Sequence, residues 1–345
     1  MNCPSVTVLL PVYNAAAYVE EAVRSILQQT FTDFELLILD DGSTDSSGQL
    51  LEGLAFQDRR IRLVRRENRG LIATLNEGLA LARGEFIARM DADDRSMPER
   101  LALQYARMQN DADLLALGSG IRYLDAAGSL GRRVIYPSSY ELREALLWGA
   151  PLAHPAVMLR TEAVRYVGGY SPLFPYAEDY ALWLRLNQIG KLDNLQDILV
   201  LYRVHEASVS HQHALQQRTS SLRAQAFWLL DMPPDLSLLA IEDNFEFLAA
   251  LPLDEATRIG LLARMLALCP HFVGDASVDA ESARWLRVLK PHDALPGLRR
   301  ALALYHWRAA RFRRKEPHRL ALHLAQAFIM SPAVCVSKLL RGVSA

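Results

Sequence analysis

The sequence contains few cysteines, and their scarcity excludes two kinds of cross-linked protein. Cys3, Cys269 and Cys335 are the three cysteines among 345 residues, and none has the spacing of a metal ligand pair. A disulfide framework and a cysteine-based zinc site are therefore excluded. Thiols used this sparingly indicate a reducing compartment, where they serve as core or surface side chains.

A long apolar run and a strong net charge are also missing. No uncharged apolar stretch approaches the roughly 18 residues that a membrane-spanning helix requires. The first residues lead into the β-prone run 6–10 without the basic region and cleavage site of a signal peptide. Because the formal net charge is −1, the molecule as a whole has no electrostatic reason to bind nucleic acid. These features predict a cytoplasmic location and no nucleic acid partner.

Composition and the order of apolar segments indicate a folded α/β protein. Hydrophobic residues make up 51% and charged residues 22%, which excludes a disordered or fibrous chain. Between the strands we expect helices, the first capped by Asn14 and the third ended by Gly84. The expected strands are residues 6–10, 34–39, 61–64 and 86–90. This alternation predicts a parallel sheet, whose ligands bind at the carboxyl ends of its strands.

The pattern changes twice farther along the chain. Up to about residue 210 strands and helices are mixed, with strands expected at 114–117, 134–136, 156–159 and 198–202 and helices at about 140–148 and 179–189. Beyond that point the strands stop, and we expect helices at 212–230, 236–251, 254–268, 279–289 and 293–313. The sequence therefore predicts one α/β domain, residues 1–211, and a helical region, residues 212–345.

The segment ARMDADD, residues 88–94, places three carboxylates directly behind an apolar strand. A group of oxygen ligands at the end of a strand suits a hard cation such as Mg²⁺ or Mn²⁺, which takes further ligands from water and from a substrate's phosphates. The implied ligand is a diphosphate. A second interpretation stays open here, in which the carboxylates solvate a loop or cap the helix that starts near Pro98.

Three stretches of the sequence together resemble the family-2 glycosyltransferases. They are LLPVYNAAAYVEEAVRSILQQTFTDFELLILDDGSTD (9–45), RENRGLIATLNEGLALARGEFIARMDADD (66–94) and YAEDYALWLRL (176–186). The resemblance covers about residues 5–210 and is most specific over 5–95. It implies the GT-A fold, an α/β nucleotide-binding sandwich with a mostly parallel mixed sheet, followed here by the α-helical C-terminal region. It also implies an inverting enzyme that transfers sugar from a nucleotide-diphosphate donor to a hydroxyl of a glycan or lipid-linked glycan, in cell-surface polysaccharide or lipopolysaccharide synthesis.

The resemblance assigns the donor's nucleoside to the first two strand ends. Pro11, Val12 and Tyr13 would line its pocket, with Tyr13 lying against the base. Asp41 would accept a hydrogen bond from a ring nitrogen of the base, which favours uracil or thymine, while its neighbour Asp40 would support the loop. Arg69 would lie near the base or the phosphates.

The resemblance also assigns the acidic segment to the donor and a cation. Asp91 and Ala92 would contact the nucleotide-sugar, and Asp93 would ligate the Mn²⁺ or Mg²⁺ ion that bridges its phosphates. Asp94 would cap the following turn. His205 in YRVHEASVS would be a further metal ligand, although a histidine after a strand is also found as an ordinary hydrogen-bonded residue.

The general base is assigned to the third stretch. Asp179 of EDY would take the proton of the acceptor hydroxyl, and its alternative role is the N-cap of the helix that follows. Glu178 would assist loop or acceptor geometry. His154 would lie on the acceptor side.

Three other functions compete with this interpretation. A nucleotidyltransferase would need a glycine-rich basic loop after the first strand, where this chain has PVYNAAAY. A dinucleotide oxidoreductase would need G-x-G-x-x-G after an early strand. An inactive nucleotide-sugar-binding or scaffold module would need no general base. The Gln-x-x-Arg-Trp segment of processive relatives is replaced by ESARW (281–285), which predicts one sugar per encounter.

The C-terminal segment is basic. Residues 301–345 contain eight lysines and arginines and one glutamate, interleaved with aromatic side chains. One reading is peripheral contact with anionic lipids on the inner face of the membrane, which suits a lipid-linked acceptor. The other is a solvated cationic face whose apolar side packs on the transferase domain.

Overall fold

The computed structural model of the chain describes residues 3–146, 149–205, 213–229, 232–241, 247 and 250–252. The chain divides into two compact units, Met1–His213 and Ala214–Ala345. All residues of the candidate site belong to the first unit.

The first half of that unit alternates strands and helices. Its elements are β1 (Val6–Val12), α1 (Val19–Leu27), β2 (Phe34–Asp40), α2 (Ser47–Gln57), β3 (Ile61–Arg65), α3 (Leu71–Leu81), β4 (Phe86–Arg89), β5 (Arg95–Ser96) and α4 (Arg100–Gln109). The second half mixes them, with β6 (Leu114–Asp125), β7 (Leu130–Val134), α5 (Ser139–Leu146), the 3₁₀ helix η1 (His154–Ala156), β8 (Met158–Arg160), α6 (Thr161–Tyr166), α7 (Glu178–Ile189) and β9 (Lys191–Val204).

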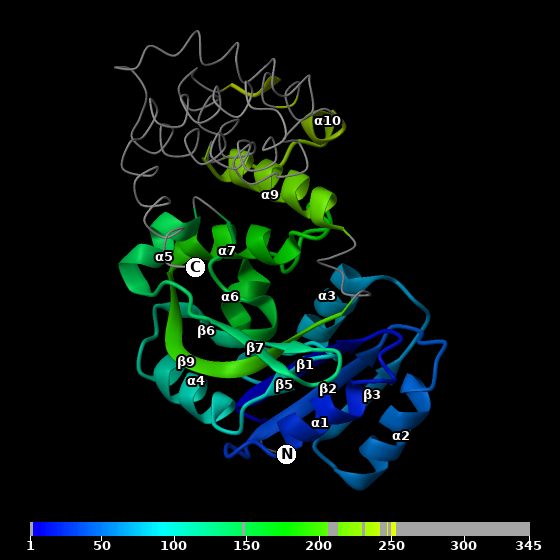
Figure 1. Cartoon of the computed structure of the whole chain (residues 1–345). Coiled ribbons are helices and arrows are strands. Elements are labelled where there is room, and N and C mark those ends of the chain that lie inside the picture. Colours follow the sequence, from blue (N-terminus) through cyan, green and yellow to red (C-terminus); the bar gives the residue numbers. More distant parts are fainter. Residues whose placement is uncertain are drawn as a thin grey trace, which may run out of the picture. The chain divides into compact units, whose positions relative to one another are not determined.

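Within the described residues, nine strands form one mixed sheet (Figure 1). The order is β3-β2-β1-β4-β8-β6-β9-β5, with β7 paired to β6. Strands β1 to β4 are parallel, β8 runs antiparallel to its neighbours β4 and β6, and β6 and β9 are parallel. The α/β fold with a mostly parallel mixed sheet, predicted from the sequence, is confirmed.

Both faces of the parallel half are covered, which explains its continuous apolar strands. All seven residues of β1 are buried. Val8 joins the core cluster that contains Val23 of α1 and Leu51 of α2. On the opposite face, a Cβ built on Gly78 of α3 would lie 2.2 Å from a methyl of Leu9. Helices α1 and α2 therefore cover one face, and α3 covers the other.

The sequence predicts that Gly84 ends α3, and this prediction is wrong. The helix ends at Leu81 with Ala82 as its C-cap. A Cβ on Gly84 would lie 2.4 Å from the backbone nitrogen of Thr7, so this glycine allows the chain to pass close to β1.

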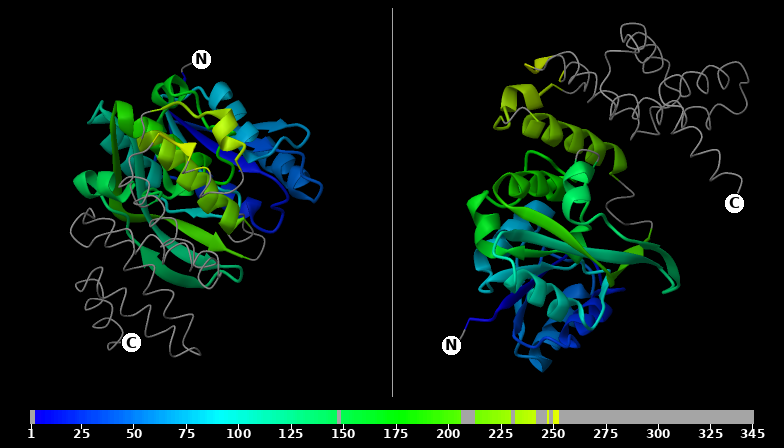
Figure 2. Two further views of the ribbon diagram at one scale, coloured as in Figure 1. Left: turned by 90° about the horizontal axis from the view of Figure 1, so that it is seen from above. Right: turned by 90° about the vertical axis from the view of Figure 1, so that its left-hand side faces the viewer.

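The strands of the second half also differ from expectation. The strand expected at 156–159 lies at Met158–Arg160, and the one expected at 198–202 extends over Lys191–Val204. The strand expected at 114–117 continues to Asp125, and the one expected at 134–136 lies at Leu130–Val134. The two form a hairpin, shown in teal, that projects from the sheet (Figure 2, right). Four of the five residues of β7 are exposed, so the segment has no apolar signal by which a sequence pattern would reveal it.

The second unit is described only in part. Helix α9 (Ala214–Leu229) contains Arg223, which donates hydrogen bonds to the carbonyls of Leu239 and Ile241 at 3.0 and 2.6 Å and lies 5.2 Å from the ring centroid of Phe247. Helix α10 (Leu236–Leu239) is capped by Asp235. The helices expected at 254–268, 279–289 and 293–313, the ESARW segment and the basic residues 301–345 lie outside the described residues.

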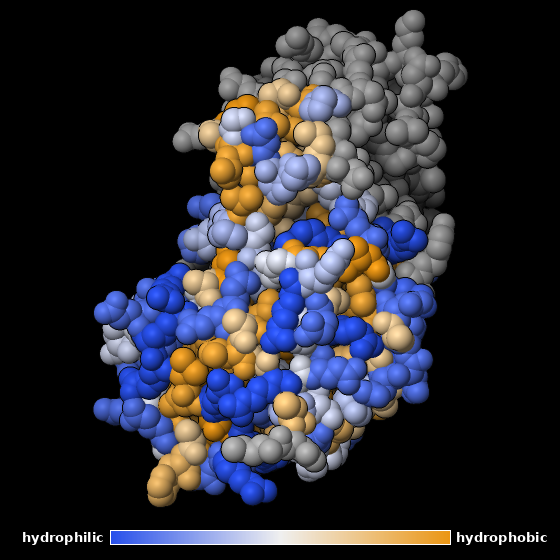
Figure 3. Space-filling model, turned by 180° about the vertical axis from the view of Figure 1, so that it is seen from behind, coloured by the Kyte–Doolittle hydropathy of each residue, from blue (hydrophilic) through white to orange (hydrophobic). Residues whose placement is uncertain are grey.

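No helix in the described ranges is long and apolar enough to cross a membrane. On the coloured part of the face in Figure 3, hydrophilic residues predominate and apolar residues form separate patches.

Candidate active site

The carboxyl ends of β1, β2 and β4 lie side by side. Val12 is paired directly with Asp40, and the N–H of Asp41 donates to the carbonyl of Val12 at 2.8 Å. On the other side of β1, the N–H of Met90 donates to the carbonyl of Leu9 at 3.1 Å. The residues that follow each strand therefore emerge at one edge of the sheet, as the parallel topology predicts.

Tyr13 is the exposed residue at the end of β1. Pro11 and Val12 are buried within the strand, whereas the Tyr13 side chain is 52% exposed. A large aromatic ring held on the backbone of a buried strand is suited to stacking against a flat ligand.

Asn14 joins two loops and does not cap α1, contrary to the sequence expectation. Its φ is +49°, and its side-chain oxygen accepts a hydrogen bond from the N–H of Thr44 at 2.8 Å. Its own N–H donates to the Ser43 hydroxyl at 3.0 Å. Helix α1 begins only at Val19.

Asp40 and Asp41 are both buried, and each holds a different loop. Asp40 accepts hydrogen bonds from the N–H of Ser43 at 2.9 Å and from Nε of Arg65 at 3.1 Å. Asp41 accepts from the N–H groups of Arg69 and Gly70 at 2.8 and 2.9 Å.

Asp41 also forms an ion pair with Arg66, whose guanidinium is fixed by Glu77. Three donors occupy a group that offers about four acceptor positions, so Asp41 retains one for a ligand. The Arg69 side chain is 66% exposed, with its nearest carboxylate 3.9 Å away on Glu77. The backbone N–H of Arg69 therefore fixes the loop through Asp41, whereas the Arg69 side chain faces solvent.

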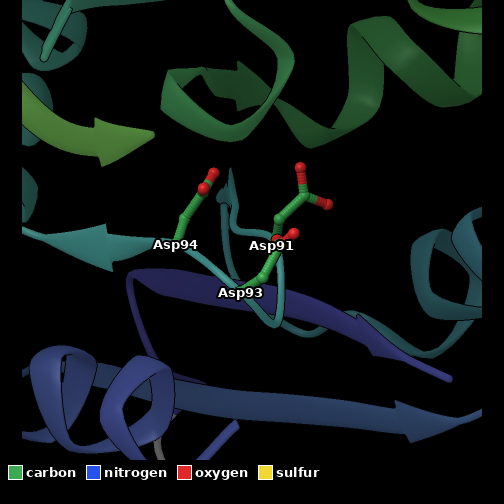
Figure 4. A group of neighbouring side chains, drawn as sticks. All are labelled: Asp91, Asp93 and Asp94. Carbon is green, nitrogen blue, oxygen red and sulfur yellow. The ribbon is translucent and has the colours of Figure 1, made fainter. Parts of the chain in front are cut away.

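The loop after β4 carries the acidic cluster. Asp91, Asp93 and Asp94 each offer one carboxylate oxygen, and these oxygens all lie within 4.8 Å of one another. Figure 4 shows the three side chains projecting to the same side of the loop. Asp91 and Asp93 are half-buried, and Ala92 between them is buried. Burial raises the pKa of Asp91, and the neighbouring charge of Asp93 adds to the increase.

Arg89, which the sequence analysis missed, is a buried cation beneath this cluster. It is 3% exposed and forms an ion pair with Asp91, while its Nε has no hydrogen-bond partner in the described chain. Its positive charge opposes the increase that burial causes in the pKa of Asp91, of Glu178 and of Asp179. The available signal is a single arginine inside the otherwise apolar strand Phe86–Arg89.

Asp94 anchors β9 and does not cap a turn, contrary to expectation. One oxygen accepts a hydrogen bond from the N–H of Arg203 at 2.7 Å, and the other is buried without a partner among the described residues. The Arg203 guanidinium donates to the carbonyl of Asp93 at 2.7 Å and pairs with Glu21 at 2.5 Å. Arg203 was also missed. It is one of four charged residues in β9 and directly follows the run 198–202 that the sequence pattern identifies as a strand.

His205 follows β9 and meets the acidic cluster. Its Nε2 lies 2.9 Å from Oδ2 of Asp93, and its ring centroid lies 5.2 Å from that of Tyr18. Carboxylate oxygens with one imidazole form a donor set that fits Mn²⁺ or Mg²⁺. The unpartnered oxygen of Asp94 is consistent with a cation at this cluster.

Glu178 and Asp179 begin α7. Ala177 is the N-cap, so neither acid is a capping residue, and Asp179 accepts a hydrogen bond from the N–H of Tyr180 at 2.7 Å. Burial raises the pKa of Glu178 to about 7, and the charge of Asp179 adds to the increase. Burial raises the pKa of Asp179 as well, while the helix N–H and Arg89 oppose it. A carboxylate with a raised pKa is a better proton acceptor.

His154 lies in η1, buried between aromatic rings. Its Nε2 is 3.0 Å from the Tyr170 hydroxyl, and its ring centroid is 6.0 Å from that of Trp183. Burial and the charge of Arg89 hold the pKa of His154 well below its usual range. The imidazole is therefore neutral.

Two solved structures illustrate the architecture that this chain shares with known proteins. TarS from S. aureus in complex with UDP-GlcNAc matches with a TM-score of 0.55 at 20% identity, over 97% of this chain and 91% of that chain. The mannosyltransferase PcManGT from Pyrobaculum calidifontis, in complex with GDP-Man and Mn²⁺, matches with a TM-score of 0.54 at 18% identity, over 97% and 88%. The chain has the GT-A fold of these proteins.

Sequence comparison gives the family. The profile described as "Glycosyl transferase family 2" matches residues 7–167. The Escherichia coli protein named O-antigen biosynthesis glycosyltransferase WbnJ is 34% identical over 208 residues, which are 59% of this chain and 81% of that protein. The chain, whose acidic cluster follows β4, therefore belongs to glycosyl transferase family 2.

Proposed function

We propose that the protein is an inverting, metal-dependent glycosyltransferase that adds one sugar per encounter. The donor is a UDP- or dTDP-sugar, and the acceptor is a hydroxyl of a glycan or lipid-linked glycan in cell-surface polysaccharide or lipopolysaccharide synthesis. One observation carries the proposal: three carboxylate oxygens lie within 4.8 Å of one another behind β4, and His205 lies 2.9 Å from Asp93 of this cluster. The buried carboxylates at the start of α7 supply a proton acceptor, which a binding module would not need.

The donor's base is assigned to the ends of β1 and β2. Tyr13 offers an exposed ring there, and Asp41 offers one remaining acceptor position to a ring N–H, a feature of uracil and thymine. The UDP-sugar bound to TarS supports a uridine donor. Arg69 is placed to approach the phosphates through its exposed guanidinium, and Asp91 and Ala92 line the same edge.

The cation is assigned to Asp93 and His205. When bound, Mn²⁺ or Mg²⁺ would neutralise the charge that grows on the departing diphosphate. The Mn²⁺ ion in the mannosyltransferase neighbour supports this assignment. Arg203 holds the loop in place through the Asp93 carbonyl.

Asp179 is proposed as the general base. The acceptor oxygen forms a bond with the anomeric carbon while the bond from that carbon to the donor's phosphate oxygen breaks. The acceptor proton passes to the Asp179 carboxylate, and the nucleoside diphosphate leaves with the electron pair. Burial raises the pKa and hence the basicity of Asp179, whereas the N–H of Tyr180 and the charge of Arg89 oppose the increase and favour the ionised form that accepts a proton.

Transfer is expected to slow as the pH falls through the range in which the neighbouring carboxylates Glu178 and Asp179 take up protons. The pKa of Glu178 is raised to about 7 and that of Asp179 is raised beside it, so acidification protonates the pair and removes the base. Glu178→Gln removes a negative charge next to Asp179 and should move the acid limb of the kcat profile to lower pH. A limb that stays in place, measured between pH 5 and 9, would show that Glu178 does not tune the base.

Calorimetric titration tests the proposed function directly. The purified chain is titrated with UDP, dTDP, GDP and UDP-sugars, each with Mn²⁺ and with a chelator. We expect metal-dependent binding of a uridine or thymidine nucleotide. Binding of no nucleotide would reject the proposal in favour of a scaffold.

Two alternatives from the sequence are distinguished by the products that the protein releases. An inactive nucleotide-sugar-binding module binds the donor without releasing nucleoside diphosphate. A nucleotidyltransferase releases pyrophosphate from a nucleoside triphosphate. We further propose that the enzyme acts in the cytoplasm. Membrane contact through residues 301–345 lies outside the described residues and stays a prediction.

A further inference from the structure

The β6–β7 hairpin carries a row of side chains that the proposed donor site does not use. Tyr123 of β6 pairs directly with Tyr202 of β9, and their ring centroids lie 5.8 Å apart, edge to face. On the other side of Tyr123, the Arg132 guanidinium lies 4.9 Å from the ring centroid and donates to the tyrosine hydroxyl at 3.4 Å. Arg132, Tyr123 and Tyr202 thus form a row across three strands, here called the hairpin row.

The hairpin row ends beside the acidic cluster. Ile121 and Val200 lie two positions before the two tyrosines on the same face, and both are buried in a small core against which the tyrosines pack. Tyr202 is followed directly by Arg203, whose N–H donates to Asp94 at 2.7 Å. The row therefore lies next to the residues of the proposed cation site.

Arg132 is exposed and has no acidic partner among the described residues. On the opposite face of the hairpin, Arg122 and Arg133 are directly paired, and neither forms an ion pair within the described ranges. Like charges placed opposite each other destabilise a strand pair. The Arg122–Arg133 pair therefore lowers the stability of the hairpin while it gives this surface a positive charge. A guanidinium held over an aromatic ring presents its remaining N–H groups to a carboxylate or phosphate.

We propose that the hairpin row is an acceptor subsite for an anionic glycan, one that carries a carboxylate or a phosphate group. This inference rests on the proposed function, because Asp179 must be the group to which the acceptor hydroxyl is presented. The tyrosine rings contribute flat apolar surface and hydroxyl groups to the sugar, and Arg132 contributes the selectivity for the anionic group. Its position beside the acidic cluster, reached through the Arg203–Asp94 hydrogen bond, distinguishes the row from a general basic surface.

Three small probes test the subsite on the full chain in the presence of UDP and Mg²⁺. They are methyl β-D-glucuronide, glucose 6-phosphate and the uncharged methyl β-D-glucoside, with binding measured by saturation-transfer NMR. We expect both anionic probes to bind about tenfold more tightly than the neutral one, because only they can form a charge-assisted bidentate contact with the Arg132 guanidinium. Arg132→Ala should abolish this preference, and Tyr123→Ala should weaken the binding of all three.

Arg133→Ala is the matched control, because it removes the same charge from the neighbouring residue on the opposite face. It should retain the preference for anionic probes. The inference is wrong if the wild-type chain shows no such preference, or if Arg132→Ala and Arg133→Ala reduce it equally. Calorimetric binding of UDP should be unchanged in all three variants. A wild-type chain that binds no UDP would reject the proposed function itself, whatever the probes do.

Discussion

Asp179→Asn is expected to reduce sugar transfer by about 10²–10⁴-fold, which is the contribution of a positioned general base. The amide keeps the size of the side chain and an oxygen that can accept the N–H of Tyr180, so the start of α7 should be preserved. Binding of UDP with Mn²⁺ should stay within about twofold, because the base contacts the acceptor and not the nucleotide. Release of nucleoside diphosphate measures the loss, both with an acceptor and as donor hydrolysis by water.

Glu178→Gln provides the matched control for this result. It makes the same chemical change one residue earlier, at a side chain that is more deeply buried than Asp179. We expect it to retain most of the transfer activity at pH 8, with a shifted pH profile. Normal transfer by Asp179→Asn would assign the base to another group, and an equal loss in both variants would mean that the pair acts as one unit.

Asp93→Ala should abolish the metal dependence of donor binding. The affinity for UDP in the presence of Mn²⁺ is expected to fall by at least about 100-fold. Mutation of residues that only support a metal ligand already lowers metal affinity by about 10–100-fold, and Asp93 is the proposed ligand itself. Without metal, the variant should be as stable as the wild type or more stable, since the substitution relieves repulsion among three carboxylates within 4.8 Å. Calorimetry with Mn²⁺ and with chelator measures the first effect, and thermal unfolding measures the second.

A carboxylate far from the site separates this effect from a change in net charge. Asp113 is exposed and pairs with Lys191 on the surface, so Asp113→Ala should bind UDP as the wild type does. His205→Gln should weaken Mn²⁺-dependent binding less than Asp93→Ala does, since the imidazole is neutral when it coordinates. If Asp93→Ala and the wild type bind UDP equally well with Mn²⁺, the ligand assignment is wrong.

The buried half of the sheet is readily predicted from the sequence. Strand β2 is covered on both faces, so all seven of its residues are buried and the expected range 34–39 falls one residue short of its end. The edge that gathers Tyr13, Asp41 and the acidic cluster follows from the parallel order of these strands. The β6–β7 hairpin cannot be predicted from apolar patterns, because four of the five residues of β7 are exposed and need not be apolar.

The supporting residues of the site are also beyond a pattern search. Arg89 is a single charge at the end of an apolar strand, and Arg203 is one of four charged residues in β9, so neither stands out as a site residue. Their partners are fixed only by the tertiary fold. Asn14 shows the same effect on a local scale, since a side chain that resembles a helix cap bonds instead to a loop thirty residues away. Sequence patterns reveal which surfaces are buried, whereas polar contacts between residues far apart in the sequence become visible only in the three-dimensional structure.

Arg203 and His205 also set the order in which the protein can become functional during synthesis. Their contacts with Asp93 span 110 and 112 residues, so the nucleotide edge of β1, β2 and β4 leaves the ribosome well before they do. At typical elongation rates this interval is roughly 5–20 s. During it the three carboxylates repel one another without Arg203 to hold their loop. The last strand of the sheet would therefore complete the proposed cation site, and a nascent chain that ends before β9 is expected not to retain Mn²⁺.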